Sequence, residues 1–297
     1  MKCLKKILSA FLLLLLWAGF DARAQRIPQI DADRAMAYLT AQTDLGPRNP
    51  GSKGHAAGRD YLLNELKEWA DDAYLQPFTH KKIQMWNIVA VFGEGEKPVL
   101  LCAHWDTRPF AEHDPTPANR KTPILGANDG ASGVAILLEI ARQLHETPLP
   151  YPVVIVLFDG EDYGRTTAEM FLGSTHYAKN PIPSKPRFAI LLDMVGDADL
   201  SIPIEPFSQQ AAPELVKGVW ETAHEIGADA FSTKIGPAVL DDHIPLIKAG
   251  IPAIDIIDFS YPYWHTIADT PDKCSPQSLK TVGDVTLRYL FTRVSPP

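Results

Sequence analysis

The chain has 297 residues, of which 45% are hydrophobic and 22% charged, a composition typical of a globular protein with a sizeable core. Its 28 Lys and Arg residues against 36 Asp and Glu give a net charge of -8. This balance argues against nucleic-acid binding, because phosphate contacts need basic side chains. Three cysteines exclude a disulfide framework; in the mature chain we expect two unpaired cysteines rather than one disulfide.

The first 24 residues have the pattern of a secretory signal peptide. Lysines precede an apolar run at 7–20, and Ala22-Arg23-Ala24 follows it. The run is shorter than the about 20 residues that a membrane-spanning helix needs. We therefore expect cleavage after Ala24, no stable membrane insertion of the mature chain, and export to a periplasm or beyond.

Hydrophobic patterns after the signal peptide predict helices alternating with strands in one domain, residues 25–297. The spacing predicts helices at 60–71, 131–145, 213–226 and from 276 to about 291, and strands at 83–92, 99–103, 152–158, 188–195 and 253–257. The segment 105–124 contains no obvious element, and loops of that length are often functional. The alternation predicts a three-layer α/β/α sandwich around a central mixed, mostly parallel sheet.

Titratable residues follow several of the predicted strands, where open α/β sheets form their sites. They are His104 and Asp106, the run Asp159-Gly160-Glu161-Asp162, Asp193, and His265 in Tyr263-Trp264-His265-Thr266, while Asp129 precedes a predicted helix. Acids crowded at one edge of a sheet repel each other, and a divalent cation removes that repulsion. Carboxylate and imidazole ligands without cysteine are typical of catalytic zinc.

These residues also have ordinary structural interpretations. Asp129 could cap the helix that follows it, Asp193 could be a buried, hydrogen-bonded carboxylate, and Glu161 could lie in a solvated turn. Their joint placement at strand ends favours a site. We expect His113 and His145, in polar surroundings, to lie at the surface.

Six motifs, in order, resemble those of the zinc aminopeptidase-like superfamily. They are H-x-D (104–106), G-A-N-D-G (126–130), F-D-G-E-D (158–162), L-L-D (191–193), D-D-H-I-P (241–245) and W-H-T (264–266). Within the superfamily the chain is most similar to the glutaminyl-peptide cyclotransferase (glutaminyl cyclase) family of the animal type, in a bacterial-looking version. The resemblance extends roughly from residue 86 to 269.

The resemblance implies an activity: conversion of N-terminal glutaminyl residues of peptides and proteins to pyroglutamate, with release of ammonia. One zinc ion would polarise the side-chain amide, and a general acid/base would move a proton from the α-amine to the leaving nitrogen. The implied roles are zinc ligands at Asp129, Asp162 and His265, the acid/base at Glu161, neighbouring acids at Asp193 and Asp241, and a substrate contact at Trp264.

The chain departs from the family pattern at three positions. Asp162 stands where the cyclases often have Glu, a longer ligand of the same charge. Asp255 stands where animal members carry His, and Cys102 lies one position before a cysteine of the animal forms. These departures concern details of the pocket more than the reaction.

Two other functions compete with a cyclase. In a two-zinc aminopeptidase, His104 and Asp193 would join the other three ligands around two ions, and Glu161 would activate a bridging water. The D-D-H-I-P and W-H-T segments favour the cyclase. A non-catalytic, receptor-like domain of the same fold would be expected to lose ligands or the base, and this chain keeps them all. We expect a monomer, because the sequence shows no exposed apolar stripe.

Overall fold

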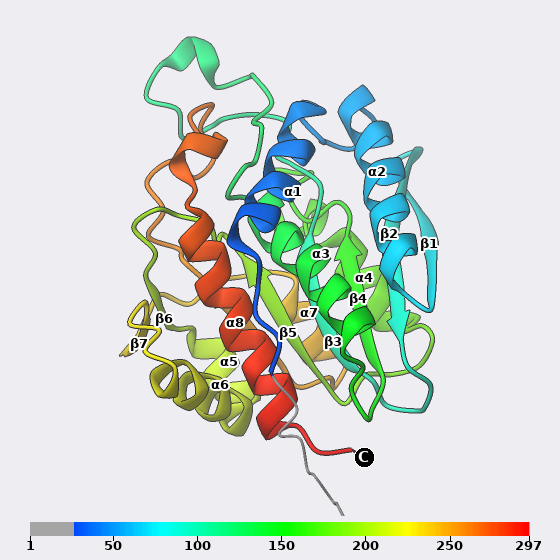
Figure 1. Cartoon of the computed structure of the whole chain (residues 1–297). Helices are drawn as coiled ribbons and strands as arrows, with labels where there is room; N and C mark the ends of the chain where they lie inside the picture. The colour runs from blue at the N-terminus through cyan, green and yellow to red at the C-terminus, as the bar shows by residue number, and fades with distance from the viewer. Residues whose placement is uncertain (1–26, 297) are drawn as a thin grey trace, which may run out of the picture.

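The computed structural model describes residues 27–296, and the predicted signal peptide lies outside them. Figure 1 shows the elements in chain order: α1 (Ala32–Asp44), α2 (Lys53–Trp69), β1 (Asp72–His80), β2 (Ile83–Phe92), β3 (Val99–His104), η1 (Pro117–Asn119), α3 (Ala131–Glu146), β4 (Val153–Phe158), η2 (Thr167–Glu169), α4 (Leu172–Lys179), β5 (Phe188–Asp193), β6 (Ile202–Ile204), α5 (Pro206–Ala211), α6 (Pro213–Glu225), β7 (Phe231–Ile235), α7 (His243–Lys248), β8 (Ala253–Ile257), η3 (Pro271–Lys273) and α8 (Pro276–Arg293).

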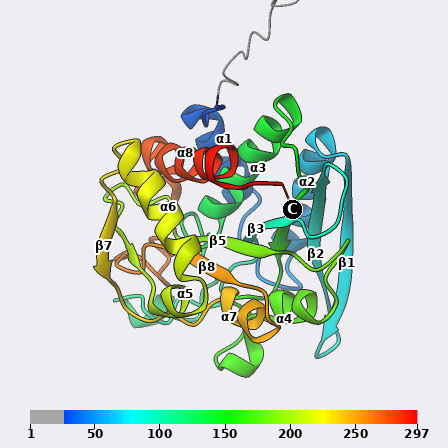
Figure 2. The ribbon, with the colours of Figure 1, turned by 90° about the horizontal axis from the view of Figure 1, so that it is seen from below.

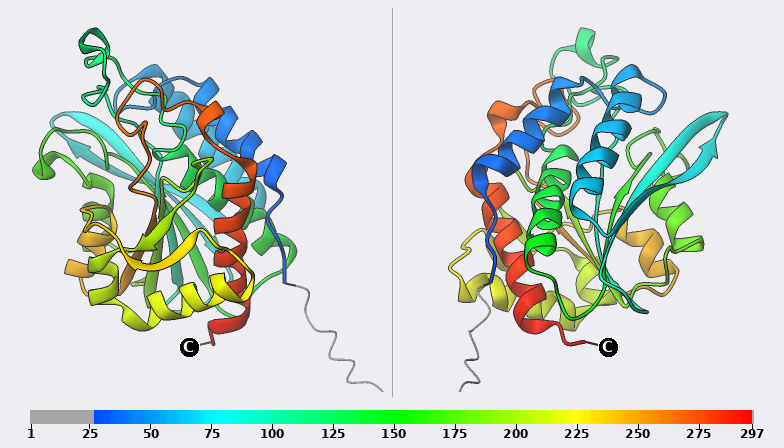
Figure 3. Two further views of the ribbon diagram at one scale, coloured as in Figure 1. Left: turned by 90° about the vertical axis from the view of Figure 1, so that its left-hand side faces the viewer. Right: turned by 45° about the vertical axis from the view of Figure 1, so that its right-hand side comes forward.

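Six strands form one mixed sheet in the order β1-β2-β4-β3-β5-β8. The strands β4, β3, β5 and β8 run parallel, whereas β2 is antiparallel to both of its neighbours. The outer hairpin of β1 and β2 reaches past the helices in Figure 3. Because the four parallel strands end at one edge, the loops that follow them meet there.

Helices cover both faces of the sheet, which confirms the predicted three-layer architecture. In Figure 2, α1, α2, α3 and α8 lie on one side of the strands, and α4, α5 and α7 lie on the other. Successive residues of a strand point to opposite faces of the sheet. Leu101 of β3 packs into the core under α3 and α8, whereas Leu100 and Cys102 pack against α4 and α7. A strand buried on both faces requires the continuous apolar run seen in the sequence.

The predicted strands and helices are all present, with shifts of a few residues at some ends. The largest shift is at α2, which begins at Lys53 rather than near residue 60, because Ser52 caps it by accepting a hydrogen bond from the His55 backbone N–H. Ser275 likewise caps α8. The elements that sequence analysis missed are α1, β1, α4, α5, β6, β7 and α7.

Two further observations bear on the expectations from sequence. Cys102 and Cys274 are both buried and free, as expected. Between residues 27 and 296, no helix combines the length and hydropathy needed to cross a bilayer.

Candidate active site

The predicted site residues meet at the edge of the sheet where the parallel strands end, at the top in Figure 1. His104 and Asp193 are the last residues of β3 and β5, the acidic run 159–162 follows β4, and the loop carrying His265 follows β8. A cavity of about 220 Å³ opens here. Its walls include seven of the eight predicted residues: Asp129, Glu161, Asp162, Asp193, Asp241, Trp264 and His265.

Three side chains form a group suited to a metal ion. One donor atom each from Asp129, Asp162 and His265 lies within 4.8 Å of the other two. His265 Nε2 is 3.3 Å from Asp162 Oδ1 and 3.6 Å from Asp129 Oδ2. All three residues are buried.

The hydrogen bonds of this group favour an ion there. Asp129 Oδ2 and Asp162 Oδ2 are buried and have no hydrogen-bond partner among the described residues. Buried carboxylate oxygens are costly unless paired, hydrogen-bonded or bound to a cation. Carboxylate oxygens and imidazole nitrogens both bind zinc, and a catalytic zinc site has three protein ligands and an open fourth position. The residues therefore fit a zinc ion.

His104, the eighth predicted residue, forms a second group that shares Asp129 with the first. His104 Nε2 lies 3.1 Å from both Asp129 Oδ1 and Asp193 Oδ1. Burial alone lowers the pKa of His104, but the surrounding carboxylates raise it well above its usual range. Gly130 makes this contact possible, because a Cβ at that position would lie 2.5 Å from His104 Nε2.

Glu161 lines the same cavity as the first group, and its Oε2 lies 3.9 Å from His104 Nδ1. Burial and the adjacent Asp162 carboxylate raise its pKa well above the usual range, while His104 lowers it. A carboxyl group with a raised pKa can both accept and release a proton near neutral pH. This is the property expected of a general acid/base.

The two acids predicted to lie near Glu161 line the same cavity but bond elsewhere. Asp193 bonds to His104, and Asp241 accepts a hydrogen bond from the backbone N–H of Asp242. Burial and the nearby Asp193 raise the pKa of Asp241 well above its usual range. The cavity thus crowds several carboxyl groups around Glu161.

A buried cluster lies behind Asp241 and includes Asp255, the residue that departs from the animal pattern. Donor atoms of Asp241, His243 and Asp255 lie within 4.8 Å of one another. His243 Nδ1 is 3.7 Å from Asp255 Oδ2, and its Nε2 is 3.4 Å from Glu205 Oε2. The imidazole thus sits between two buried carboxylates.

Sequence analysis missed two residues of the long loop that contact the candidate ligands. Glu112 Oε1 is 3.2 Å from His265 Nδ1 and also accepts hydrogen bonds from Arg108. Arg108 Nη1 donates to Asp162 Oδ1 at 2.9 Å. Burial lowers the pKa of His265, but Asp162, Glu112 and Asp129 raise it to about 10. The only sequence signal for this pair was the length of the loop, since neither residue belongs to a motif.

Two other acids position the backbone of the site. Asp106 of the H-x-D motif accepts hydrogen bonds from the backbone N–H groups of Glu161 and Asp162, at 3.0 and 3.2 Å. Asp269 accepts from the backbone N–H groups of Asn128 and Asp129. Both acids stabilise loops that carry site residues, so Asp106, the acid of H-x-D, is explained without a metal.

Aromatic rings form one wall of the cavity around Trp264. The Trp264 ring lies 4.1 Å from the ring of His265, 4.6 Å from that of His113 and 4.9 Å from that of Phe259. His113 is exposed, as predicted, although it contacts the site, and His145 is exposed as well. The wall offers an apolar surface beside the three-ligand group.

Comparison with known proteins agrees with this geometry. The sequence pattern of peptidase family M28 matches residues 87–290. The chain belongs to peptidase family M28. This assignment confirms the resemblance to zinc aminopeptidase-like enzymes, and solved glutaminyl cyclases from bacteria are among its structural neighbours.

Three similar proteins include one glutaminyl cyclase and two aminopeptidases. The crystal structure of Tannerella forsythia glutaminyl cyclase has 40% sequence identity and a TM-score of 0.86, and the match covers 90% of this chain and 100% of that one. A leucine aminopeptidase precursor from Bacteroides thetaiotaomicron has 37% identity and a TM-score of 0.87, over 90% and 99% of the two chains. Aminopeptidase YwaD of Bacillus subtilis is 27% identical over 88% of this chain, which spans only 57% of that protein.

Proposed function

We propose that this M28 protein is a zinc-dependent glutaminyl-peptide cyclotransferase. It would convert N-terminal glutaminyl residues of peptides and proteins to pyroglutamate and release ammonia. One observation carries the proposal: Glu161, a carboxyl group with a raised pKa, lines the same cavity of about 220 Å³ as the three-ligand group. That volume is below the about 300 Å³ at which pockets for larger ligands begin, so it suits one side chain. The similarity to Tannerella forsythia glutaminyl cyclase supports the same reaction.

The chain's own residues divide the chemistry. Asp129, Asp162 and His265 would hold the zinc ion, which when bound supplies Lewis acidity at the side-chain amide oxygen. Glu161 accepts a proton from the α-amine, which must be neutral to attack, and then delivers it to the leaving amide nitrogen. Because amine and amide belong to one residue held in a small cavity, positioning contributes much of the rate.

Three further residues complete the proposed site. Asp241 raises the proton affinity of Glu161 through like charge, which favours the shuttle, and Asp193 lines the same cavity. Trp264 offers its ring to the substrate beside His265. None of these roles requires a water nucleophile.

A two-zinc aminopeptidase is the second candidate, and the His104 group favours it. The donor atoms of His104, Asp129 and Asp193 also lie within 4.8 Å of one another. A second ion there would share Asp129 with the first. In these two groups, the buried carboxylate oxygens that lack a hydrogen-bond partner among the described residues are Asp129 Oδ2 and Asp162 Oδ2, and both belong to the group with His265. This favours one ion, bound by that group.

The deciding experiment gives the purified protein a short peptide that begins with glutamine. A cyclase yields the lactam peptide and ammonia, whereas an aminopeptidase yields free glutamine and a shortened peptide. We expect lactam, loss of activity on chelation, recovery with zinc, and one zinc ion per chain by elemental analysis. Free glutamine as the main product would refute the proposal, as would full activity of a variant carrying both Asp129→Ala and His265→Ala.

Export and a monomeric state belong to the same proposal. The pattern at 1–24 supports a cleaved signal peptide, and amino-terminal sequencing of the protein isolated from cells would test cleavage after Ala24. Sedimentation of the purified protein tests the monomer.

A further inference from the structure

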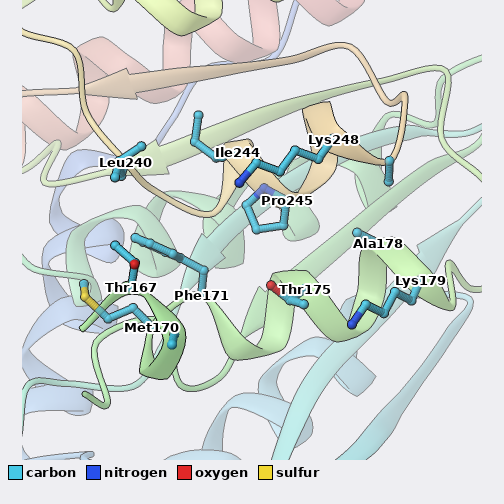
Figure 4. A pocket seen from close by; sticks show the side chains of 12 residues that line it. Thr167, Met170, Phe171, Thr175, Ala178, Lys179, Leu240, Ile244, Pro245 and Lys248 are labelled. Carbon is cyan, nitrogen blue, oxygen red and sulfur yellow. The ribbon is translucent and has the colours of Figure 1, made fainter. Parts of the chain in front are cut away.

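A second cavity, of about 610 Å³, lies outside the site between helices α4 and α7. Figure 4 shows it as a groove whose two walls come from these helices and from the segments that precede them. Its walls are largely apolar, with Ile244 and Pro245 on one side and Ala178 on the other. A groove of this volume lies within the range of about 300–1,000 Å³ typical of ligand sites.

The groove adjoins the catalytic cavity and shares part of its wall. Thr167, Met170, Phe171 and Leu240 line both spaces. Leu240 lines both spaces and keeps 52% of its surface exposed, so it lies at the open junction between them. A substrate whose first residue enters the catalytic cavity can therefore continue into the groove.

The shared wall is tied to the catalytic loop. Phe171 has a left-handed backbone conformation, with φ 55°, which residues other than glycine rarely adopt. Its backbone N–H donates to the carbonyl of Glu161 at 3.0 Å, and that of Leu172 donates to Gly160 at 3.1 Å. Strained residues held in place in this way concentrate at functional sites. The bonds fix the position of the groove relative to the proposed acid/base.

The groove carries positive charge at its far end. Phe171 immediately precedes α4 and Lys179 ends it; Leu240 lies shortly before α7 and Lys248 ends it. Both lysines are exposed, line the groove and form no salt bridge with any described residue, and the groove walls include no acid. The whole chain has a net charge of -8, so a groove lined by two lysines and no acid differs in charge from the rest of the protein.

The helix lengths set how far a substrate must reach. The helices have eight and six residues, which at about 1.5 Å per residue gives about 9–12 Å from the junction to the lysines. An extended peptide rises about 3.3 Å per residue, so three or four residues after the first cover that distance.

We propose that this groove binds the part of the substrate peptide that follows its N-terminal glutamine. It selects apolar side chains close to the glutamine and an acidic group at about the fourth or fifth position, which pairs with Lys179 and Lys248. The inference rests on the proposed cyclotransferase function and names the peptides that this activity favours.

The test compares kcat/KM for lactam formation from three substrates: glutamine amide, Gln-Leu-Ala-Glu-Glu-amide and Gln-Leu-Ala-Lys-Lys-amide. At low salt the wild type prefers the acidic over the basic pentapeptide by about three- to tenfold, mainly through KM, because exposed ion pairs are individually weak. The preference shrinks in 0.5 M salt, as screening requires. The variant K179E/K248E loses or reverses the preference and keeps its rate on glutamine amide. A matched variant, K217E/K234E, changes two lysines outside the groove and keeps the preference.

Each outcome separates the groove from the catalytic proposal. Lactam from all three substrates at rates independent of charge overturns the groove and leaves the catalytic function standing. The same holds if K179E/K248E and K217E/K234E behave alike. No lactam from any substrate overturns the catalytic function and the groove with it. If K179E/K248E and the wild type prefer the acidic pentapeptide equally, its charge is recognised outside the groove, which also overturns the proposal.

Discussion

Glu112 offers the sharpest test of how the chain holds its metal. Its Oε1 lies 3.2 Å from His265 Nδ1 and accepts hydrogen bonds from Arg108 at 2.9 and 2.5 Å. Replacing Glu112 by Ala removes the partner that orients the imidazole. It also removes the carboxylate that shares Arg108 with Asp162, so the guanidinium draws more electron density from the Asp162 carboxylate. Both effects weaken the ligand set.

The expected magnitude follows from these contacts. Loss of a partner that orients a metal-binding histidine typically weakens metal affinity by about 10- to 100-fold. That corresponds to about 1.4–2.7 kcal/mol. We expect Glu112→Ala to fall in this range and Glu112→Gln to lose less, because a glutamine oxygen can still accept one of the two sets of hydrogen bonds.

The assay is competition for zinc between the metal-free protein and a chromophoric chelator. Glu146→Ala is the control: Glu146 is an exposed residue of α3 that, among residues 27–296, pairs only with Arg142, so its removal should leave zinc affinity unchanged. Saturating zinc should restore most of the activity of Glu112→Ala. A zinc Kd within twofold of the wild type would show that Glu112 does not position His265.

Three further predictions concern catalysis, packing and pH. Glu161→Gln should lower kcat by about 10²- to 10⁴-fold with zinc content unchanged, because it removes the proton carrier alone. Gly133→Ala should lower Tm by several degrees, since a Cβ there would overlap the carbonyl oxygen of Leu192. Gly227 has open space around it, so Gly227→Ala should cost about 1 kcal/mol of stability through its φ of +73°. Glu205→Gln should destabilise the protein by up to about 3 kcal/mol at pH 7. Burial raises the pKa of Glu205, but the His243 imidazole 3.4 Å away and hydrogen bonds from the backbone N–H groups of Phe207 and Ser208 lower it from 4.5 to about 2.

The sign of the pH effect distinguishes the last prediction. The folded-state pKa of Glu205 lies below the unfolded value, so its contribution is present above pH 4.5 and disappears as the pH falls towards 2. Denaturant unfolding should therefore separate Glu205→Gln from wild type more at pH 7 than at pH 3, and an equal gap would contradict it. Loss of zinc from Glu161→Gln, or equal Tm values for the two glycine variants, would contradict the other two predictions.

The sequence by itself determined the elements whose burial is continuous or periodic. The runs in β3, β4, β5 and β8 are apolar because both faces of these strands are covered. Successive positions along such a strand must therefore be mostly apolar, and the sequence shows this directly. The strand β1 was missed because it lies at the sheet edge, contains Pro77 and alternates between buried and exposed residues irregularly. Short helices such as α7, with six residues, carry too little periodicity to be recognised.

The motifs also indicated which residues meet, because residues at the ends of parallel strands share an edge whatever the order of the strands. The tertiary structure alone decided what supports them. Glu112 and His265 are 153 positions apart, and the groove joins helices that begin at residues 172 and 243. Such contacts depend on how two loops fold over the sheet, and no local pattern of hydrophobicity or charge records the approach of segments so distant along the chain.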